Sequence, residues 1–128
     1  MLGADPVSSM EAATKQYVDN KVPTNIKNGS TSGSIRTSQS ESEGDSYTMG
    51  ECAFSEGIYT KASGNYSHAE GYLTTASGTS GAHSEGSSTI ASGDYSHAEG
   101  YQTRAVASTS HAEGFQTIAS GDRSHAEG

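Results

Sequence analysis

The sequence has few of the residues from which globular cores are built. Of its 128 residues 30% are hydrophobic, with two Phe and no Trp. So small an apolar content ordinarily favours disorder, because it cannot offset the conformational entropy that folding removes. Two routes to a stable structure remain: a repeat whose backbones stack into a hydrogen-bonded ladder, or several chains that share one core.

The sequence also lacks an excess of basic residues, a second cysteine and a long apolar run, and each of these absences restricts the possible functions. Seven Lys and Arg against fifteen Asp and Glu leave a formal charge of −8, which argues against a nucleic-acid partner, since phosphates attract basic side chains. The single Cys52 excludes an intrachain disulfide and leaves the redox compartment open. No apolar run is long enough for a signal peptide or a membrane span, so we expect neither membrane insertion nor secretion by this N-terminus.

The sequence does contain a short, strict repeat. The pentapeptide Ser-His-Ala-Glu-Gly begins at positions 67, 96, 110 and 124, a near-copy spans 82–86, and weaker versions span 40–44 and 53–57. The glycines that end these units lie at 44, 57, 71, 86, 100, 114 and 128, at intervals of 13, 14, 15, 14, 14 and 14 residues. This period predicts stacked coils, with the extra residue of the longest interval bulging out within Thr79–Ala82.

Each unit holds two short extended runs separated by turns, such as 58–62 and 67–70. We expect the glycines at 50, 64, 78, 93 and 121 to turn the chain with positive φ, although Ala107 occupies that place in one unit. Identical positions of stacked coils would then lie about 4.8 Å apart. The pattern predicts an all-β repeat, a parallel β-roll or β-solenoid of 14-residue coils, over residues 44–128.

Alternation along a strand assigns the two faces of a coil. Ser67, Ala69 and Gly71 share the small side that fits a coil interior, whereas His68 and Glu70 share the other. A core of Ala and Thr methyl groups is thin, at about 0.8 kcal/mol per buried methylene-sized group. We therefore expect a homotrimer, with aromatic side chains between the chains: Tyr72, Tyr101 and Phe115, together with Tyr66 and Tyr95.

The first 23 residues predict a short α-helix that trimerises or attaches the chain. Ser8 and Glu11 fit a capping box, and Pro23 ends the helix. Met10, Ala13 and Tyr17 fall on one helical face and would meet in three copies; a helix lying on the surface of a neighbour is the alternative. Residues 24–43 are rich in Ser, Gly and Asn and predict a linker, either irregular or formed by degenerate first strands of the repeat.

Two resemblances bear on function. Residues 5–19, Asp-Pro-Val-Ser-Ser-Met-Glu-Ala-Ala-Thr-Lys-Gln-Tyr-Val-Asp, resemble a segment of many bacteriophage tail-fibre and tail-appendage proteins. The resemblance implies a virion protein of the tail, made in the host cytoplasm. Its partners would be other tail or baseplate proteins, through the N-terminal segment, and a receptor on the host surface.

Residues 44–128 resemble the head repeat of trimeric autotransporter adhesins, whose units carry Ala-x-Gly-x-x-Ser-x-Ala-x-Gly. Ala62, Gly64, Ser67, Ala69 and Gly71 match this motif. The family implies a parallel β-roll that packs as a trimer. The adhesin motif favours Val and Ile where this chain has His and Glu, and the Ser-His-Ala-Glu-Gly version is more similar to repeats of phage tail proteins.

The polar side of the repeat forms two predicted columns: His68, His83, His97, His111 and His125, beside Glu70, Glu85, Glu99, Glu113 and Glu127. Carboxylates about 5 Å apart repel by roughly 3 kcal/mol per pair at an effective dielectric constant near 20, and interleaved imidazoles relieve this. Three interpretations are open. The columns form a structural ladder that sets register; the five histidines bind metal or anions around a three-fold axis; or the columns form a cell-surface binding strip.

We expect no catalytic residue and no cofactor. Ser, His and Glu recur together in every unit, whereas a catalytic triad needs one singular geometry. The sequence therefore predicts a structural phage tail protein, a stalk or display module that contributes to host attachment. The alternatives are the head of a bacterial trimeric adhesin and, less favoured, an ice-binding solenoid that uses the ladder Thr60, Thr74, Thr89, Thr103 and Thr117.

Overall fold

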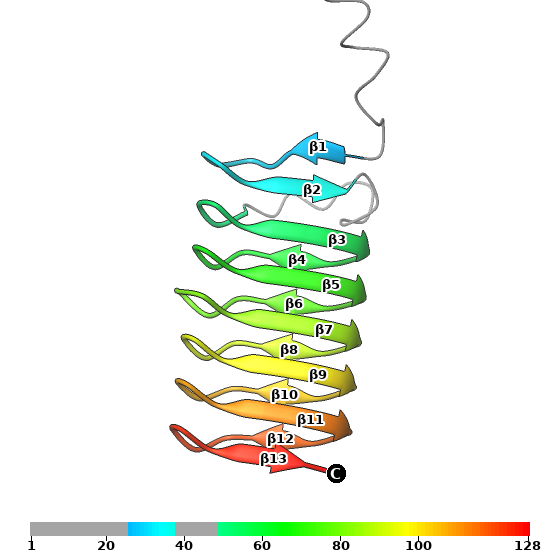
Figure 1. The fold of residues 1–128 in the computed structure, drawn as a ribbon, viewed down its shortest axis with the longest axis vertical. Helices are drawn as coiled ribbons and strands as arrows, with labels where there is room; N and C mark the ends of the chain where they lie inside the picture. The colour runs from blue at the N-terminus through cyan, green and yellow to red at the C-terminus, as the bar shows by residue number, and fades with distance from the viewer. Residues whose placement is uncertain (1–25, 38–48) are drawn as a thin grey trace, which may run out of the picture.

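The computed structural model describes residues 26–37 and 49–128, and the elements in these ranges are all strands (Figure 1). They are β1 Ile26–Asn28, β2 Ile35–Thr37, β3 Phe54–Ile58, β4 Lys61–Ala62, β5 His68–Tyr72, β6 Thr75–Ala76, β7 His83–Ser87, β8 Ile90–Ala91, β9 His97–Tyr101, β10 Arg104–Ala105, β11 His111–Phe115, β12 Ile118–Ala119 and β13 His125–Glu127. The predicted helix, with Met10, Ala13 and Tyr17, lies outside the described residues.

The strands form two sheets that run along one stack. The five-residue strands and the three-residue β1, β2 and β13 make one sheet, in the order β1-β2-β3-β5-β7-β9-β11-β13 (Figure 1). The two-residue strands make the other, in the order β12-β10-β8-β6-β4. From β2 to β13 every pairing is parallel and places equivalent residues of successive coils opposite one another, as in His97 on His111. The predicted all-β parallel solenoid of roughly 14-residue coils is thereby confirmed.

An antiparallel hairpin begins the long-strand sheet. β1 pairs with β2 antiparallel, and β2 pairs with β3 parallel. Both strands lie within residues 24–43, the range predicted as a linker. The described part of this range therefore contributes strands to the sheet, which is one of the two alternatives given for it. The hairpin covers the edge of β3, which would otherwise present unpaired backbone groups.

The interior of the coils is filled by very small side chains. In the described residues the buried hydrophobic core consists of Met49 and ten alanines. Buried Ser and Thr side chains complete it: Ser34, Ser55, Thr60, Ser67, Thr74, Ser84, Thr89, Ser96, Thr103 and Ser110. The predicted inward positions of Ser67, Ala69, Thr60 and Ala62 are confirmed, because only small side chains fit inside the coil. The prediction is wrong for Gly71, which is exposed.

Two of the coils contain a buried hydroxyl pair. The Ser84 and Thr89 hydroxyl oxygens are 2.7 Å apart, and those of Ser55 and Thr60 are 2.9 Å apart. In two of the coils with Ala at the serine position, the buried Thr74 and Thr103 hydroxyls have no hydrogen-bond partner in the part of the chain that the structure describes. An unpaired buried hydroxyl destabilises a protein by about 1–3 kcal/mol.

The turns correct one prediction about glycine. Positive φ does not occur at Gly50, Gly64, Gly78, Gly93 or Gly121. It occurs at the glycines that end the units, such as Gly100 at +107°, and at non-glycine residues such as Tyr66 and Leu73, at +57° and +56°. Gly50, Gly64, Gly78 and Gly93 are instead required by close approach: a Cβ at Gly64 would lie 1.8 Å from the carbonyl oxygen of Gly78 in the next coil.

The 15-residue interval is accommodated at one turn, as predicted. The φ of Gly81 is +60°, and its N–H donates to the Asn65 carbonyl at 2.8 Å, so the stack continues through the longer coil. Asp94 of the next coil accepts hydrogen bonds from the backbone N–H and the hydroxyl of Thr79. His68 still pairs with His83, so the insertion leaves the strand register unchanged.

Candidate functional site: the histidine–glutamate face

The outward residues of the long strands form one continuous polar surface, here called the histidine–glutamate face. Each five-residue strand from β5 to β11 presents a His at its first position and a Glu at its third, while the residue between them is buried in the coil. Because the strands are parallel and equivalent residues lie opposite one another, the histidines form one column along the stack and the glutamates form another. The two predicted columns are therefore present.

The histidine rings stack on one another. Successive ring centroids lie 4.6–4.8 Å apart with interplanar angles of 2–7°. Phe54 stacks on His68 at 5.2 Å and extends the column by one ring. The substitution of Phe for His in the first complete unit thus preserves the stack.

Each histidine lies near the glutamate of the preceding coil, and four of the five form an ion-pair contact with it. The distance from Nε2 to that carboxylate oxygen is 3.6 Å for His68–Glu56 and His97–Glu85, and 3.5 Å for His111–Glu99. Only the His125–Glu113 pair, at 3.0 Å, is a hydrogen bond. The Nε2 atoms of His68, His83, His97 and His111 have under 1 Å² of exposed surface and no hydrogen-bond partner within the described ranges.

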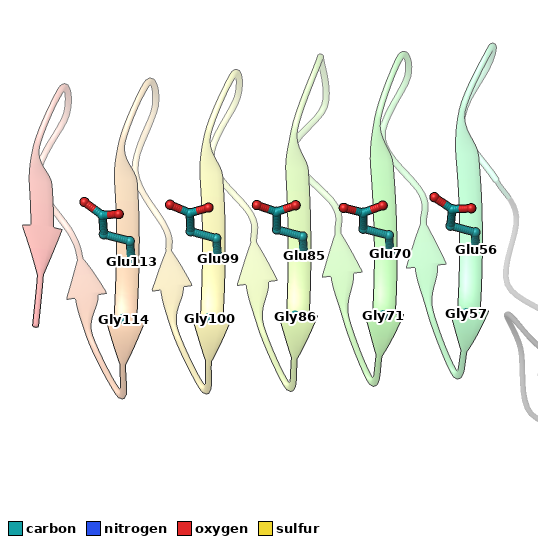
Figure 2. A pocket seen from close by; sticks show the side chains of 10 residues that line it. All are labelled: Glu56, Gly57, Glu70, Gly71, Glu85, Gly86, Glu99, Gly100, Glu113 and Gly114. Atoms are coloured by element: carbon teal, nitrogen blue, oxygen red, sulfur yellow. The ribbon is translucent and has the colours of Figure 1, made fainter.

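A groove of about 700 Å³ runs beside the glutamates (Figure 2). It is lined by Glu56, Glu70, Glu85, Glu99 and Glu113 and by the glycine that follows each of them. A side chain at these glycines would collide with the next coil, as the Cβ of an alanine at 100 would lie 2.2 Å from the Gly114 carbonyl oxygen. The groove is therefore a consequence of the same glycines that allow the coils to approach.

The central carboxylates share protons. Side-chain hydrogen bonds with Glu70 and Glu99 raise the pKa of Glu85 to about 7, and burial and their charges act in the same direction. The pKa values of Glu70 and Glu99 are lowered, chiefly by the hydrogen bond that each receives from Glu85. One proton on Glu85 thus relieves the repulsion among three carboxyl groups.

Burial lowers the histidine pKa values in the middle of the stack. The pKa of His83 is lowered by desolvation and then by the charges of His97 and His68; that of His97 is lowered by desolvation and then by His111. Neutral rings therefore predominate at these two positions near pH 7. A neutral imidazole keeps one ring nitrogen with a lone pair, which can accept a proton or a metal ion.

An exposed apolar column borders the groove, beyond the glycines. The register aligns Ile58, Tyr72, Ser87, Tyr101 and Phe115, and the rings of Tyr101 and Phe115 stack at 5.3 Å. The exposed fraction is 47% for Tyr72, 44% for Tyr101 and 61% for Phe115. Tyr66 and Tyr95 are also exposed but lie at the turns that precede the long strands.

Two other sequence patterns do not form surface sites. Thr60, Thr74, Thr89 and Thr103 are completely buried, so this threonine ladder faces the coil interior and offers no surface to ice. Ser67 and Ser96 are buried too, and each hydroxyl donates to a glycine carbonyl at 2.6 Å. They lie on the opposite side of the strand from His and Glu and form no triad with them.

No protein-family model matches the chain, and comparisons with curated proteins and with solved structures found no match either. In the described residues no helix is long and apolar enough to cross a membrane. The site is therefore interpreted from its own geometry. Sequence reasoning missed the offset of each His toward the preceding coil's Glu, because that contact depends on side-chain direction between coils.

Proposed function

We propose that this chain is a structural module of a phage tail fibre or appendage, a homotrimeric stalk or display element that contributes to attachment at the host surface. The observation that carries the proposal is the uniform parallel ladder from β2 to β13, in which every coil repeats the same backbone hydrogen bonds. Such a ladder makes a stiff rod with a surface that recurs coil by coil. The resemblance of residues 5–19 to tail-fibre proteins supports the tail as its location.

The thin core supports a trimer. A single chain buries only Met49 and alanines as its hydrophobic core in the described residues, while large apolar side chains remain on its surface. An exposed column of apolar side chains is typical of protein–protein contact surfaces, although Ser87 interrupts this one between Tyr72 and Tyr101. Tyr72, Tyr101 and Phe115 would be covered by the neighbouring chains of the trimer.

Light scattering coupled to size exclusion tests the assembly. We expect three times the chain mass for the natural protein and a lower mass when Tyr72, Tyr101 and Phe115 are all replaced by Ser. The control replaces Ile118 by Ser, which removes exposed apolar area from the short-strand sheet, and it should remain trimeric. A monomer for the unsubstituted chain would overturn the proposal of a shared core.

Immunogold microscopy tests the location. Label on the tails of virions, together with binding of the purified chain to host cells, would support the tail module. The second candidate is an adhesin head on a bacterial surface, favoured by the match of Ala62, Gly64, Ser67, Ala69 and Gly71 to that repeat. Label on the cell envelope and none on virions would replace the first function with the second.

A further inference from the structure

We propose that the histidine–glutamate face binds divalent transition-metal ions of the Zn²⁺ type, each held by one imidazole and the carboxylates of two consecutive coils. The site lies within one chain and does not depend on the proposed trimer or on a phage origin. It differs from a metal bound by histidines of three chains, because its ligands come from neighbouring rungs of a single ladder.

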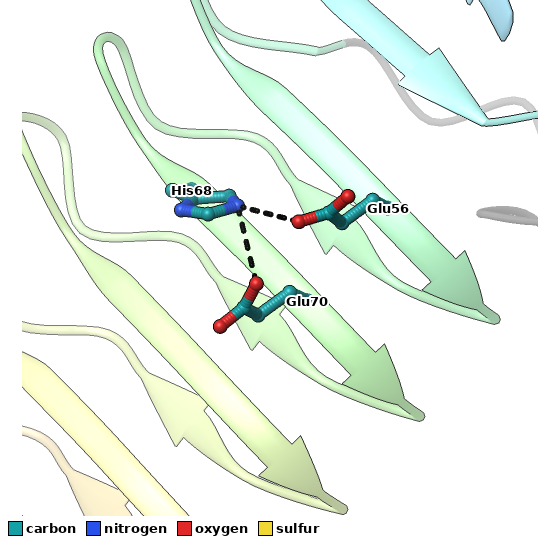
Figure 3. Close-up of side chains that lie close together, drawn as sticks. All are labelled: Glu56, His68 and Glu70. Carbon is teal, nitrogen blue, oxygen red and sulfur yellow. Dashed lines mark ion pairs between the residues drawn. The ribbon is translucent and has the colours of Figure 1, made fainter.

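Five clusters of the required composition recur along the face. They are Glu56-His68-Glu70, Glu70-His83-Glu85, Glu85-His97-Glu99, Glu99-His111-Glu113 and Glu113-His125-Glu127. In each cluster one nitrogen and two carboxylate oxygens lie within 4.8 Å of one another. Figure 3 shows the first cluster, in which the ring nitrogen of His68 points between the two carboxylates.

The distances in this first cluster suit shared coordination better than direct hydrogen bonding. His68 Nε2 lies 3.6 Å from Glu56 Oε1 and 3.8 Å from Glu70 Oε2. Hydrogen bonds between such atoms are about 2.7–3.2 Å long. Two ligands bound to one tetrahedral zinc at about 2.0–2.1 Å are separated by roughly 3.3 Å. Small rotations of the half-exposed glutamates would bring the oxygens to that separation.

The histidine nitrogens supply an independent observation. Four of the five Nε2 atoms are covered from solvent and lack a hydrogen-bond partner in the described part of the chain, although a buried polar atom without a partner is costly. Ring stacking on both sides fixes the planes of these imidazoles. A cation between the two carboxylates would give such a nitrogen a partner where it stands.

The ligand set indicates the class of ion. Imidazole nitrogen favours zinc, nickel, copper and iron, whereas magnesium and calcium prefer oxygen ligands alone. Two carboxylates neutralise one divalent charge, and water would complete the coordination. Zn²⁺ is therefore the ion with which we test the site, and Mg²⁺ is the contrasting probe.

Sharing of glutamates limits how many clusters fill at once. Glu70, Glu85, Glu99 and Glu113 each belong to two clusters, so adjacent sites would compete for a carboxylate and place two divalent ions one rung apart. Three clusters share no ligand: Glu56-His68-Glu70, Glu85-His97-Glu99 and Glu113-His125-Glu127. The last is the most exposed, so we expect two tighter ions and one weaker ion per chain.

Isothermal titration calorimetry of the full chain with Zn²⁺ tests this stoichiometry, and Co²⁺ substitution reports imidazole coordination through its visible spectrum. We expect at most three Zn²⁺ per chain and no comparable heat with Mg²⁺. Glu85→Gln combined with Glu99→Gln should remove one tight site. The control combines Glu51→Gln with Asp122→Asn, which removes the same charge from exposed turn positions and should leave all sites intact.

Three outcomes would overturn the proposal: no Zn²⁺ binding, unchanged binding in the Glu85/Glu99 variant, or one ion per three chains. The last result would assign the metal to a histidine set on a three-fold axis instead. Circular dichroism of each variant establishes that the ladder is intact. The number of Zn²⁺ ions per chain is compared with that of a folded control that has lost the same formal charge. The expected number of ions per chain is therefore the same whether or not the chain forms a trimer.

Discussion

The two sides of a single long strand follow different physical rules. In β9 the inward Ala98 is completely buried, while the outward His97 and Glu99 are about one-third exposed. On the inward side, the small space inside the coil and the close approach of neighbouring backbones permit few residue types. The outward side is decided by charge, ring stacking and proton sharing, which many arrangements could satisfy. Stability therefore depends mostly on the first side, and chemical specificity on the second.

The largest effect is expected where a glycine allows two coils to approach. Gly100→Ala places a Cβ 2.2 Å from the Gly114 carbonyl oxygen, and φ there is +107°. Strain and overpacking together should lower the free energy of unfolding by about 3 kcal/mol or more. Urea denaturation measures the loss. Gly121→Ala is the matched control, because its nearest atom would be 3.6 Å away, and equal losses in both variants would refute the steric explanation.

An intermediate effect of opposite sign is expected inside the coil. Ala98→Ser would give the buried Thr103 hydroxyl the partner that Thr89 has in Ser84. The new hydrogen bond should raise the free energy of unfolding by about 1 kcal/mol. Thermal and urea denaturation check the gain. In a Thr103→Val background the same substitution should give none, so a gain that persists there would contradict the pairing.

The smallest effect is expected on the outward side and should depend on pH. The pKa of Glu85 is raised from 4.5 to about 7 in the folded chain, so stability is lost as pH rises through this window and the carboxyl must give up its proton. Glu85→Gln stays neutral and should be more stable than the natural chain at pH 8, with the difference vanishing near pH 4. Solvent screening of the partly exposed carboxyl keeps the gain below about 1 kcal/mol.

Melting curves of both proteins from pH 4 to pH 8 measure that difference. The lowered pKa values of His83 and His97 oppose this trend at acid pH, but both proteins carry these groups. Glu51→Gln, a change at an exposed turn, should give curves parallel to those of the natural chain. If the melting temperatures of the Glu85→Gln variant and the natural chain differ by the same amount at every pH, proton sharing is not the cause of the difference.

The same contrast explains how much the sequence could predict. The period fixed the parallel register, and Ala69 with Ser67 could be assigned inward because only small residues fit there. The side chains of Thr60 and its equivalents were likewise assigned to a small side, yet the alternative of a surface threonine ladder stayed open until their burial was known. The repeat pattern predicts positive φ at the wrong glycines, because a sequence does not distinguish a glycine required by φ from one required by close approach.

The histidine–glutamate face was predicted only as two columns. The sequence places His and Glu two residues apart, but the short contact of His97 is with Glu85 of the preceding coil. That offset follows from side-chain direction across the stack, which no residue pattern encodes. The metal clusters can therefore be recognised only in the three-dimensional structure, where side chains of neighbouring coils come together.

The turn at Thr79 has a consequence for how such a chain changes length. It accepts one added residue while His68 and His83 remain paired, so insertions at that corner leave the ladder intact. Loss or gain of a whole unit would likewise preserve every rung and alter only the number of rungs, by about 4.8 Å each. Because every unit adds the same rung, the number of repeats sets the length of the stack in fixed increments.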